Sequence, residues 1–176
     1  MKVLFLYPMW TSESKGINKY FAKTSGGTVI PYNLALLAAI TEKAGHQAKI
    51  IDAELERIPL DSLAKMSKDF EPDIVVLTGM TAFYNIAIEC AQKLREQNIK
   101  AKICVGGPHV TIVEEKAYNK EFDYGFVGDG EEAWEKFLLS QENKLTLSEV
   151  PGLMYRESGN IKKNKRAYTQ KNLDIY

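Results

Sequence analysis

A repeated alternation of short apolar runs with longer amphipathic segments constrains the fold of this chain more than any other feature. The apolar runs cover residues 3–7, 48–52, 74–77, 102–105 and 123–127. Between them, apolar residues recur at helical spacing, which is typical of helices with one buried face. Helices that alternate with buried strands form a parallel sheet with helices on both of its faces.

This pattern predicts an α/β fold, Rossmann-like, with a five-stranded parallel sheet. In the flavodoxin-like strand order 2-1-3-4-5, the turns after the third, fourth and fifth strands lie side by side along one edge. The composition changes after Glu142: residues 150–156 and 161–164, separated by a turn, are typical of a C-terminal β-hairpin. We therefore predict a Rossmann-like domain over residues 1–142 and a hairpin with a linker over residues 143–176.

The overall composition limits the classes of partner. Lys+Arg and Asp+Glu both total 23, so the net charge of +0 favours a small molecule or a protein surface over nucleic acid or an anionic membrane. No apolar run approaches the length that crosses a bilayer. Cys90 and Cys104 are the only cysteines, and both lie within apolar patterns that predict small buried side chains. We therefore expect a cytoplasmic protein.

Small residues follow three of the predicted strands, at the edge where open α/β sheets bind ligands. Two adjacent glycines, Gly106 and Gly107, allow a bulky group to approach the backbone without an intervening Cβ. Hydroxyls at Thr78 and Thr81, together with backbone N–H groups at helix starts, are suited to phosphate or amide groups. The predicted binding residues are Thr78, Gly79, Met80, Thr81, Gly106, Gly107, Pro108, His109, Gly128, Asp129, Gly130 and Glu131. Together they predict a shelf for a large planar ligand, although any one of these glycines alone is explained by a tight turn.

Known catalytic constellations are missing from the sequence. It has no G-x-S-x-G elbow, no Gly-rich phosphate loop and no C-x-x-C spacing, so we expect no catalytic residue and no metal site in this segment. His109 is expected to be a hydrogen-bonded turn residue rather than a base or a ligand. Asp52 ends the second strand, where an acid binds ribose in dinucleotide folds, but the preceding glycine fingerprint is absent. Capping or loop anchoring is therefore the favoured role for Asp52.

A set of short motifs extends through nearly the whole chain in a fixed order. The motifs are PYNLALLAA at 31–39, AGH at 44–46, IDA at 51–53, DIV at 73–75, GGPHVT at 106–111, DY at 123–124, GDGE at 128–131 and PGLMYR at 151–156. They resemble the N-terminal cobalamin-binding domain of cobalamin-dependent radical S-adenosylmethionine (radical SAM) enzymes. That family usually has Gly-Glu-Gly-Glu where this chain has residues 128–131, which is a mild departure.

The resemblance implies that this domain presents cobalamin to a following radical SAM barrel, which binds an iron–sulfur cluster and S-adenosylmethionine. The corrin is then expected across the carboxyl ends of the first, third, fourth and fifth strands, with its nucleotide tail between the turns at Thr78 and Gly106. The implied reactions of the parent enzyme are methyl transfer, cyclisation or rearrangement at an unreactive carbon. The segment alone is expected to catalyse none of them.

Two further departures from known cobalamin proteins matter. The three-cysteine cluster motif is absent, so this segment either ends before the barrel or stands alone. The Asp-x-His-x-x-Gly motif of the other cobalamin-binding class is absent from Met9 to Gly26, so we expect the benzimidazole to be displaced from cobalt with no imidazole in its place. Two alternatives stay open: a non-catalytic interaction module that kept the fold without corrin, and a nucleotide-binding transferase domain.

Overall fold

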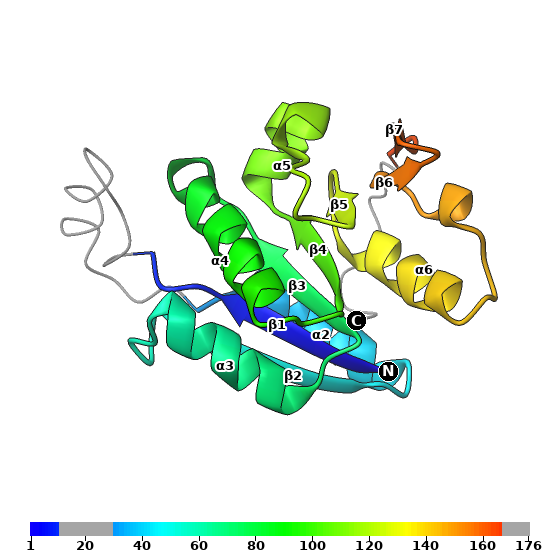
Figure 1. The fold of residues 1–176 in the computed structure, drawn as a ribbon. Helices are drawn as coiled ribbons and strands as arrows, with labels where there is room; N and C mark the ends of the chain where they lie inside the picture. Colours follow the sequence, from blue (N-terminus) through cyan, green and yellow to red (C-terminus); the bar gives the residue numbers. More distant parts are fainter. Residues whose placement is uncertain (11–29, 167–176) are drawn as a thin grey trace.

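In the computed structural model, which describes residues 1–10 and 30–166, the strands form one mixed sheet with the order β2-β1-β3-β4-β5-β6-β7 (Figure 1). The strands are β1 Lys2–Tyr7, β2 Gln47–Asp52, β3 Ile74–Thr78, β4 Lys102–Gly106, β5 Tyr124–Phe126, β6 Leu153–Glu157 and β7 Asn160–Lys163. The first five are parallel, which confirms the predicted α/β fold and strand order. The hairpin β6–β7 pairs antiparallel with β5 and so extends the same sheet. The sequence also predicts a long irregular loop from Met9 to Ile30, and most of this segment lies outside the described residues.

The connecting helices also match the sequence pattern, with one exception. They are α2 Tyr32–Lys43, α3 Leu60–Phe70, α4 Tyr84–Glu96, α5 Pro108–Val113 and α6 Glu131–Gln141, with short 3-10 turns η1 Thr81–Phe83, η2 Glu114–Ala117 and η3 Leu147–Glu149. The sequence pattern predicts one short helix from His109 to Asn119, but α5 ends at Val113. Glu114 has a φ of 53°, and its carboxylate pairs with Lys163 and Arg166 from the hairpin region. This link between distant segments is invisible in the local sequence pattern.

The sheet separates two apolar layers. Successive side chains of a strand point to opposite faces, so Leu4 and Leu6 of β1 pack against α3 and α4, while Val3, Phe5 and Tyr7 pack against α2 and α6. In Figure 1, α3 and α4 lie in front of the sheet and α2 lies behind it. The helices that follow β1 and β3 therefore lie on opposite faces, which is the arrangement that opens a crevice between two parallel strands.

A buried hydrogen bond joins the two helices of the rear layer. Trp134 of α6 donates its indole N–H to Thr41 Oγ1 of α2 at 2.8 Å, and the Thr41 hydroxyl donates to the Leu37 carbonyl at 2.8 Å. The Trp134 ring also packs edge-on against Phe5 and Phe126, with ring centroids 5.8 Å apart in both pairs. Because both polar groups are paired in an apolar layer, this contact fixes α2 relative to α6.

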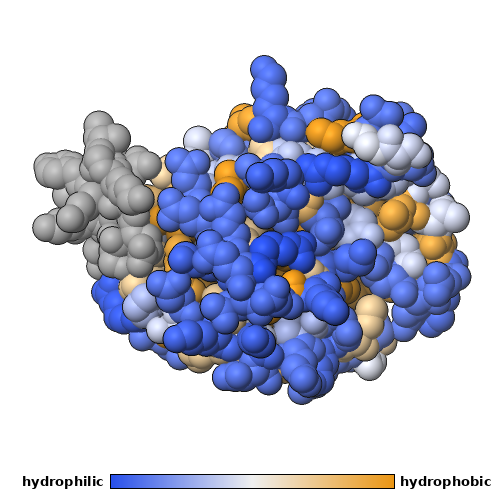
Figure 2. Space-filling model, in the orientation of Figure 1, coloured by the Kyte–Doolittle hydropathy of each residue, from blue (hydrophilic) through white to orange (hydrophobic). Residues whose placement is uncertain are grey.

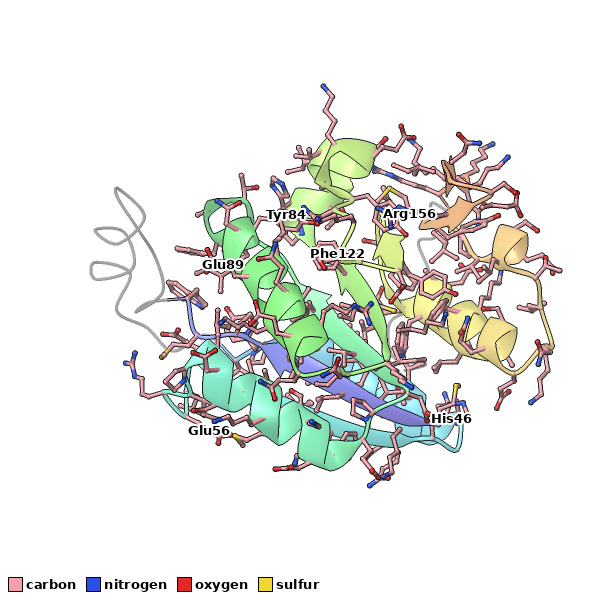
Figure 3. The ribbon with its side chains drawn as sticks, viewed as in Figure 1. His46, Glu56, Tyr84, Glu89, Phe122 and Arg156 are labelled. Carbon is pink, nitrogen blue, oxygen red and sulfur yellow. The ribbon has the colours of Figure 1, made fainter. Side chains whose placement is uncertain are left out.

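The hairpin is attached to β5 by close backbone contact. Gly152 has a φ of 66°, its carbonyl accepts a hydrogen bond from Val127 N at 3.0 Å, and a Cβ built on it would overlap the Val127 carbonyl oxygen. Arg156 of β6 reinforces the attachment by donating to the Phe122 carbonyl at 2.8 Å. Both residues are labelled in Figure 3. Glycine at position 152 is therefore required both by its conformation and by the space available.

The face seen in Figure 2 is largely hydrophilic, with apolar residues scattered over it. None of the helices within residues 1–10 and 30–166 combines the length and the apolar character needed to cross a membrane.

Substituting Gly152 should disconnect the hairpin from the sheet. We expect Gly152→Ala to lower the free energy of unfolding by about 1–2 kcal/mol for the left-handed conformation, and by roughly 1–3 kcal/mol more for the overlap with Val127. Gly159→Ala is the matched control, because Gly159 also has a positive φ of 82° but a Cβ there meets no atom of residues 1–10 and 30–166 within 4 Å. Urea unfolding followed by circular dichroism measures both values, and equal losses in the two variants would contradict the steric role of Gly152.

Candidate functional site

Four strands end in residues that face the α2–α6 layer at the carboxyl edge of the sheet. These residues are Tyr7 of β1, Thr78 of β3, Gly106 of β4 and Phe126 of β5. Their orientation follows from the alternation along each strand, since Phe5, Val76 and Cys104, two positions earlier in their strands, belong to the same apolar layer. Gly106 alone in this row has no side chain. The row is therefore hollow at the end of β4.

A cavity of about 620 Å³ occupies this hollow. Its floor is formed by the strand ends, and its walls by α2, α6, the turns after β3, β4 and β5, and Arg166. The lining residues that the sequence analysis did not select are Tyr7, Ile30, Pro31, Asn33, Leu34, Leu37, Val76, Leu77, Thr111, Phe126, Trp134 and Arg166. A volume in the range of roughly 300–1,000 Å³, with apolar walls and a few polar groups, is typical of a small-molecule site.

Nine of the twelve predicted binding residues line this cavity. They are Thr78, Met80, Gly106, Gly107, Pro108, Gly128, Asp129, Gly130 and Glu131. The other three, Gly79, Thr81 and His109, are not among its lining residues. A Cβ built on Gly79 would overlap the ring of Tyr84, so this glycine faces the α4 side of the sheet. A direct role of these three residues in ligand binding stays a prediction.

Gly107 makes possible a close approach between two neighbouring turns. Its φ is 102°, and a Cβ there would lie 2.8 Å from Thr78 Oγ1 and 3.0 Å from the Gly79 carbonyl oxygen. Two backbone hydrogen bonds join the same turns, from Gly79 N to the Gly106 carbonyl at 2.9 Å and from His109 N to the Gly79 carbonyl at 3.1 Å. The sequence suggested that Gly107 leaves room for a ligand, whereas its missing Cβ leaves room for the turn after β3.

His109 packs on the opposite side of these turns from the cavity. Its ring lies against Tyr84, with centroids 4.2 Å apart and planes at 34°, and its Nδ1 is buried without a hydrogen-bond partner among the described residues. The Tyr84 hydroxyl donates to the Ala117 carbonyl at 2.6 Å, and burial raises the pKa of Tyr84, so the phenol stays neutral. In Figure 3, Tyr84 lies at the start of α4, towards Phe122. The hydrogen bond expected of the His109 imidazole is therefore not found at Nδ1, and it is the backbone N–H of His109 that donates, to the Gly79 carbonyl.

The wall contributed by α2 was not anticipated as part of the site. Asn33 donates from Nδ2 to Thr78 Oγ1 at 3.0 Å and so orients the threonine hydroxyl at the cavity. Leu37 is partly buried and lies beside Gly130, where a Cβ would be 3.5 Å from Leu37 Cδ2. Tyr7 ends the first strand, and counting alternate residues along β1 places it on this face. Burial, followed by the charges of Asp52 and Glu54, raises the pKa of Tyr7, which keeps its hydroxyl neutral.

Charged groups gather at one side of the cavity. Arg166 donates from Nη2 to the Thr111 carbonyl at 2.7 Å and to Glu114 Oε1 at 2.6 Å. Hydrogen bonds from Lys163 and then Arg166 lower the pKa of Glu114. The Thr111 hydroxyl in turn accepts a hydrogen bond from Gly128 N at 3.1 Å, which links α5 to the turn after β5.

Three other sequence expectations concern residues outside the cavity. Asp52 Oδ1 accepts a hydrogen bond from Leu55 N at 3.0 Å, which confirms its role as a loop anchor. Cys90 and Cys104 are buried free thiols, as expected, and burial raises the pKa of Cys90 to about 12 and that of Cys104 well above its usual value. Within the described part of the chain, no three His, Cys, Asp or Glu side chains are grouped so as to hold a metal ion.

Comparison with known proteins identifies relatives along most of the sequence. Residues 19–138 match the family model of the B12 binding domain. An uncharacterized methyltransferase of Pyrococcus horikoshii is 30% identical over 164 residues, which cover 92% of this chain and 34% of that protein. The anaerobic magnesium-protoporphyrin IX monomethyl ester cyclase of Cereibacter sphaeroides is 25% identical over 180 residues, covering 99% of this chain and 28% of that protein. This chain thus spans about a third of the length of these curated relatives.

Solved structures share the fold. The cobalamin-dependent radical SAM enzyme OxsB, with aqua-cobalamin and S-adenosylmethionine bound, has a TM-score of 0.73 at 18% identity, covering 96% of this chain and 22% of OxsB. The radical SAM methyltransferase TsrM from Kitasatospora setae, with cobalamin and a [4Fe-4S] cluster bound, has a TM-score of 0.74 at 17% identity, covering 97% of this chain and 30% of TsrM. The family match extends over all the turns that line the cavity, and this chain therefore belongs to the B12-binding domain family.

Proposed function

We propose that this chain binds cobalamin at the carboxyl edge of its sheet and orients it for a radical SAM domain of the same protein. The observation that carries this proposal is the cavity above Gly106, the one residue among the four strand ends that has no side chain. Cobalamin carries a nucleotide tail that ends in a flat, apolar base. A cavity with an aromatic wall, opening at the edge where α/β sheets bind ligands, suits such a tail.

The lining residues match the parts of the cofactor in chemical character. Phe126, Trp134 and Leu37 offer apolar contact to an aromatic base, whereas Thr78 and Asn33 offer hydrogen bonds to polar groups of the tail. Met80, two residues after Thr78, lies at the rim of the cavity and has half of its surface exposed. This exposed thioether side chain is suited to contact with the face of a macrocycle. The corrin itself is then expected to lie over the turns after β1, β3, β4 and β5.

When bound, cobalamin supplies a cobalt centre that carries methyl groups or takes part in one-electron chemistry. The residues of this chain bind and orient the cofactor, and the apolar floor of the cavity excludes water from its tail. The neutral hydroxyl of Tyr7 and the oriented hydroxyl of Thr78 hold protons at fixed positions beside the ligand. None of these roles requires a nucleophile or a base.

The parent protein is proposed to be a cobalamin-dependent radical SAM enzyme that catalyses methyl transfer, cyclisation or rearrangement at an unreactive carbon. The names of the two curated relatives, a methyltransferase and a cyclase, support this range of reactions. In this proposal residues 1–142 form the cobalamin-binding domain, and Arg166 joins its cavity from the following segment. Residues 143–176 lead to the radical SAM domain, which binds the iron–sulfur cluster and S-adenosylmethionine. The buried free thiols of Cys90 and Cys104 are compatible with a cytoplasmic location.

Cobalamin uptake tests the role of the cavity directly. The 176-residue chain, incubated with hydroxocobalamin and desalted, should retain the corrin absorbance. A series Gly106→Ala, Gly106→Val and Gly106→Phe should reduce retention progressively to none, because each side chain fills more of the hollow. Among the described residues, a Cβ at Gly106 meets only Phe126 within 4 Å, at 3.6 Å or more, so the alanine variant should fold normally.

Gly159→Ala, remote from the cavity, serves as the control and should retain cobalamin like the unmodified chain. Thermal unfolding of each variant separates loss of binding from loss of folding. Full retention by a folded Gly106→Phe variant would rule out this cavity as the binding site.

The packing of His109 against Tyr84 predicts that this histidine does not coordinate cobalt. Electron paramagnetic resonance of the reduced Co(II) protein should show cobalt lines without the threefold splitting that an axial nitrogen causes, and His109→Ala should leave the spectrum unchanged. Nitrogen splitting that disappears in His109→Ala would instead make His109 a ligand. Splitting that persists in the variant would identify the cofactor's own benzimidazole.

A further inference from the structure

We propose that Arg166 binds the phosphodiester of the cobalamin nucleotide loop, and that it therefore favours complete cobalamins over corrinoids that lack this loop. This inference rests on the proposed function of the cavity, which it refines. No sequence motif pointed to Arg166, which lies in the basic segment that follows β7.

The side chain of Arg166 lies at the cavity, although Arg166 is remote in sequence from the residues that form the other walls. It lines the cavity together with Thr111, Gly128 and Asp129. A Cβ built on Gly128 would lie 3.6 Å from Arg166 Cδ, and Gly128 has a φ of 99°. The glycine turn after β5 thus accommodates the aliphatic stem of the arginine.

The Arg166 guanidinium is held in place by two hydrogen bonds, and both are donated by the same nitrogen, Nη2. Nη2 donates to the Thr111 carbonyl and to Glu114 Oε1, at 2.7 and 2.6 Å. Within residues 1–10 and 30–166, Nη1 and Nε have no hydrogen-bond partner. A guanidinium carries five N–H donors in a rigid fork that matches the oxygens of a phosphate, so the remaining donors are available to an anion. The side chain is 27% exposed, which leaves it accessible from the cavity.

The charges around the cavity also single out Arg166. Among the described residues that line it, Arg166 is the one basic side chain, and Asp129 and Glu131 are acidic. Glu114, which partly neutralises Arg166, also binds Lys163 through its other carboxylate oxygen at 2.6 Å. An anionic group that enters a cavity lined by two acids needs a cation, and the phosphodiester is the anionic group of cobalamin. Arg166 is the described residue able to supply that charge.

The test compares two ligands, hydroxocobalamin and cobinamide, which is a corrin without the nucleotide loop and its phosphodiester. Equilibrium dialysis, followed by corrin absorbance, gives the dissociation constants for the 176-residue chain and its variants. We expect Arg166→Met to weaken cobalamin binding about tenfold or more, as for loss of a charged hydrogen bond, and to change cobinamide binding less than about twofold. Arg166→Lys should retain part of the cobalamin affinity, because it keeps the charge without the fork.

Lys163→Met is the matched control. Lys163 is the other cation bound to Glu114, and its substitution removes the same charge, but Lys163 does not line the cavity. The substitution should leave the preference for cobalamin over cobinamide unchanged. An equal loss of both ligands in Arg166→Met, or no loss of either, would reduce Arg166 to a structural contact and overturn the inference. Failure of the unmodified chain to bind either corrinoid would overturn the proposed function itself.

Discussion

The close approach of the turns after β3 and β4 is the constraint on which the candidate site depends. The missing Cβ of Gly107 allows Thr78 and the backbone of Gly79 to lie against it, and two backbone hydrogen bonds hold the turns together. This contact fixes the position of the turn after β3 relative to the turn after β4 at the carboxyl edge of the sheet. Beside it, Gly106 leaves the row of strand-end side chains incomplete, so a cavity forms above β4 rather than a continued apolar layer. The two adjacent glycines therefore have different physical roles, one in packing the protein and one in leaving space.

The stability of the rear layer is linked to the shape of this cavity. Trp134 lines the cavity and also donates the hydrogen bond that joins α6 to Thr41 of α2. Leaving a buried donor such as this indole N–H without a partner costs about 1–3 kcal/mol. The same contact that stabilises the helix pair therefore also fixes the distance between two cavity walls. A pre-formed cavity reduces the ordering that a ligand must induce when it binds.

Much of the fold and part of the site were predictable from the sequence, for identifiable reasons. Apolar runs and helical spacing located the strands and helices, and small residues after three strands located nine of the lining residues. Side-chain direction at turns was less accessible, because the role of Gly79 depends on the ring of Tyr84 from the next helix. The break after Val113 and the cavity position of Arg166 depend on ion pairs of Glu114 with residues some fifty positions away. Such long-range pairings leave no periodic signal in the sequence.

The hairpin that continues the sheet also determines how the edge of the sheet meets other molecules. An edge strand presents unpaired backbone groups that can recruit a strand from another chain, and short strands with lysines resist this. Strand β7 is short, exposed along its length and carries Lys162 and Lys163. Without the hairpin, the edge would be β5, with its buried Gly125 and Phe126. The hairpin thus replaces an apolar edge strand by a short, lysine-bearing one and protects this edge of the sheet from edge-to-edge aggregation.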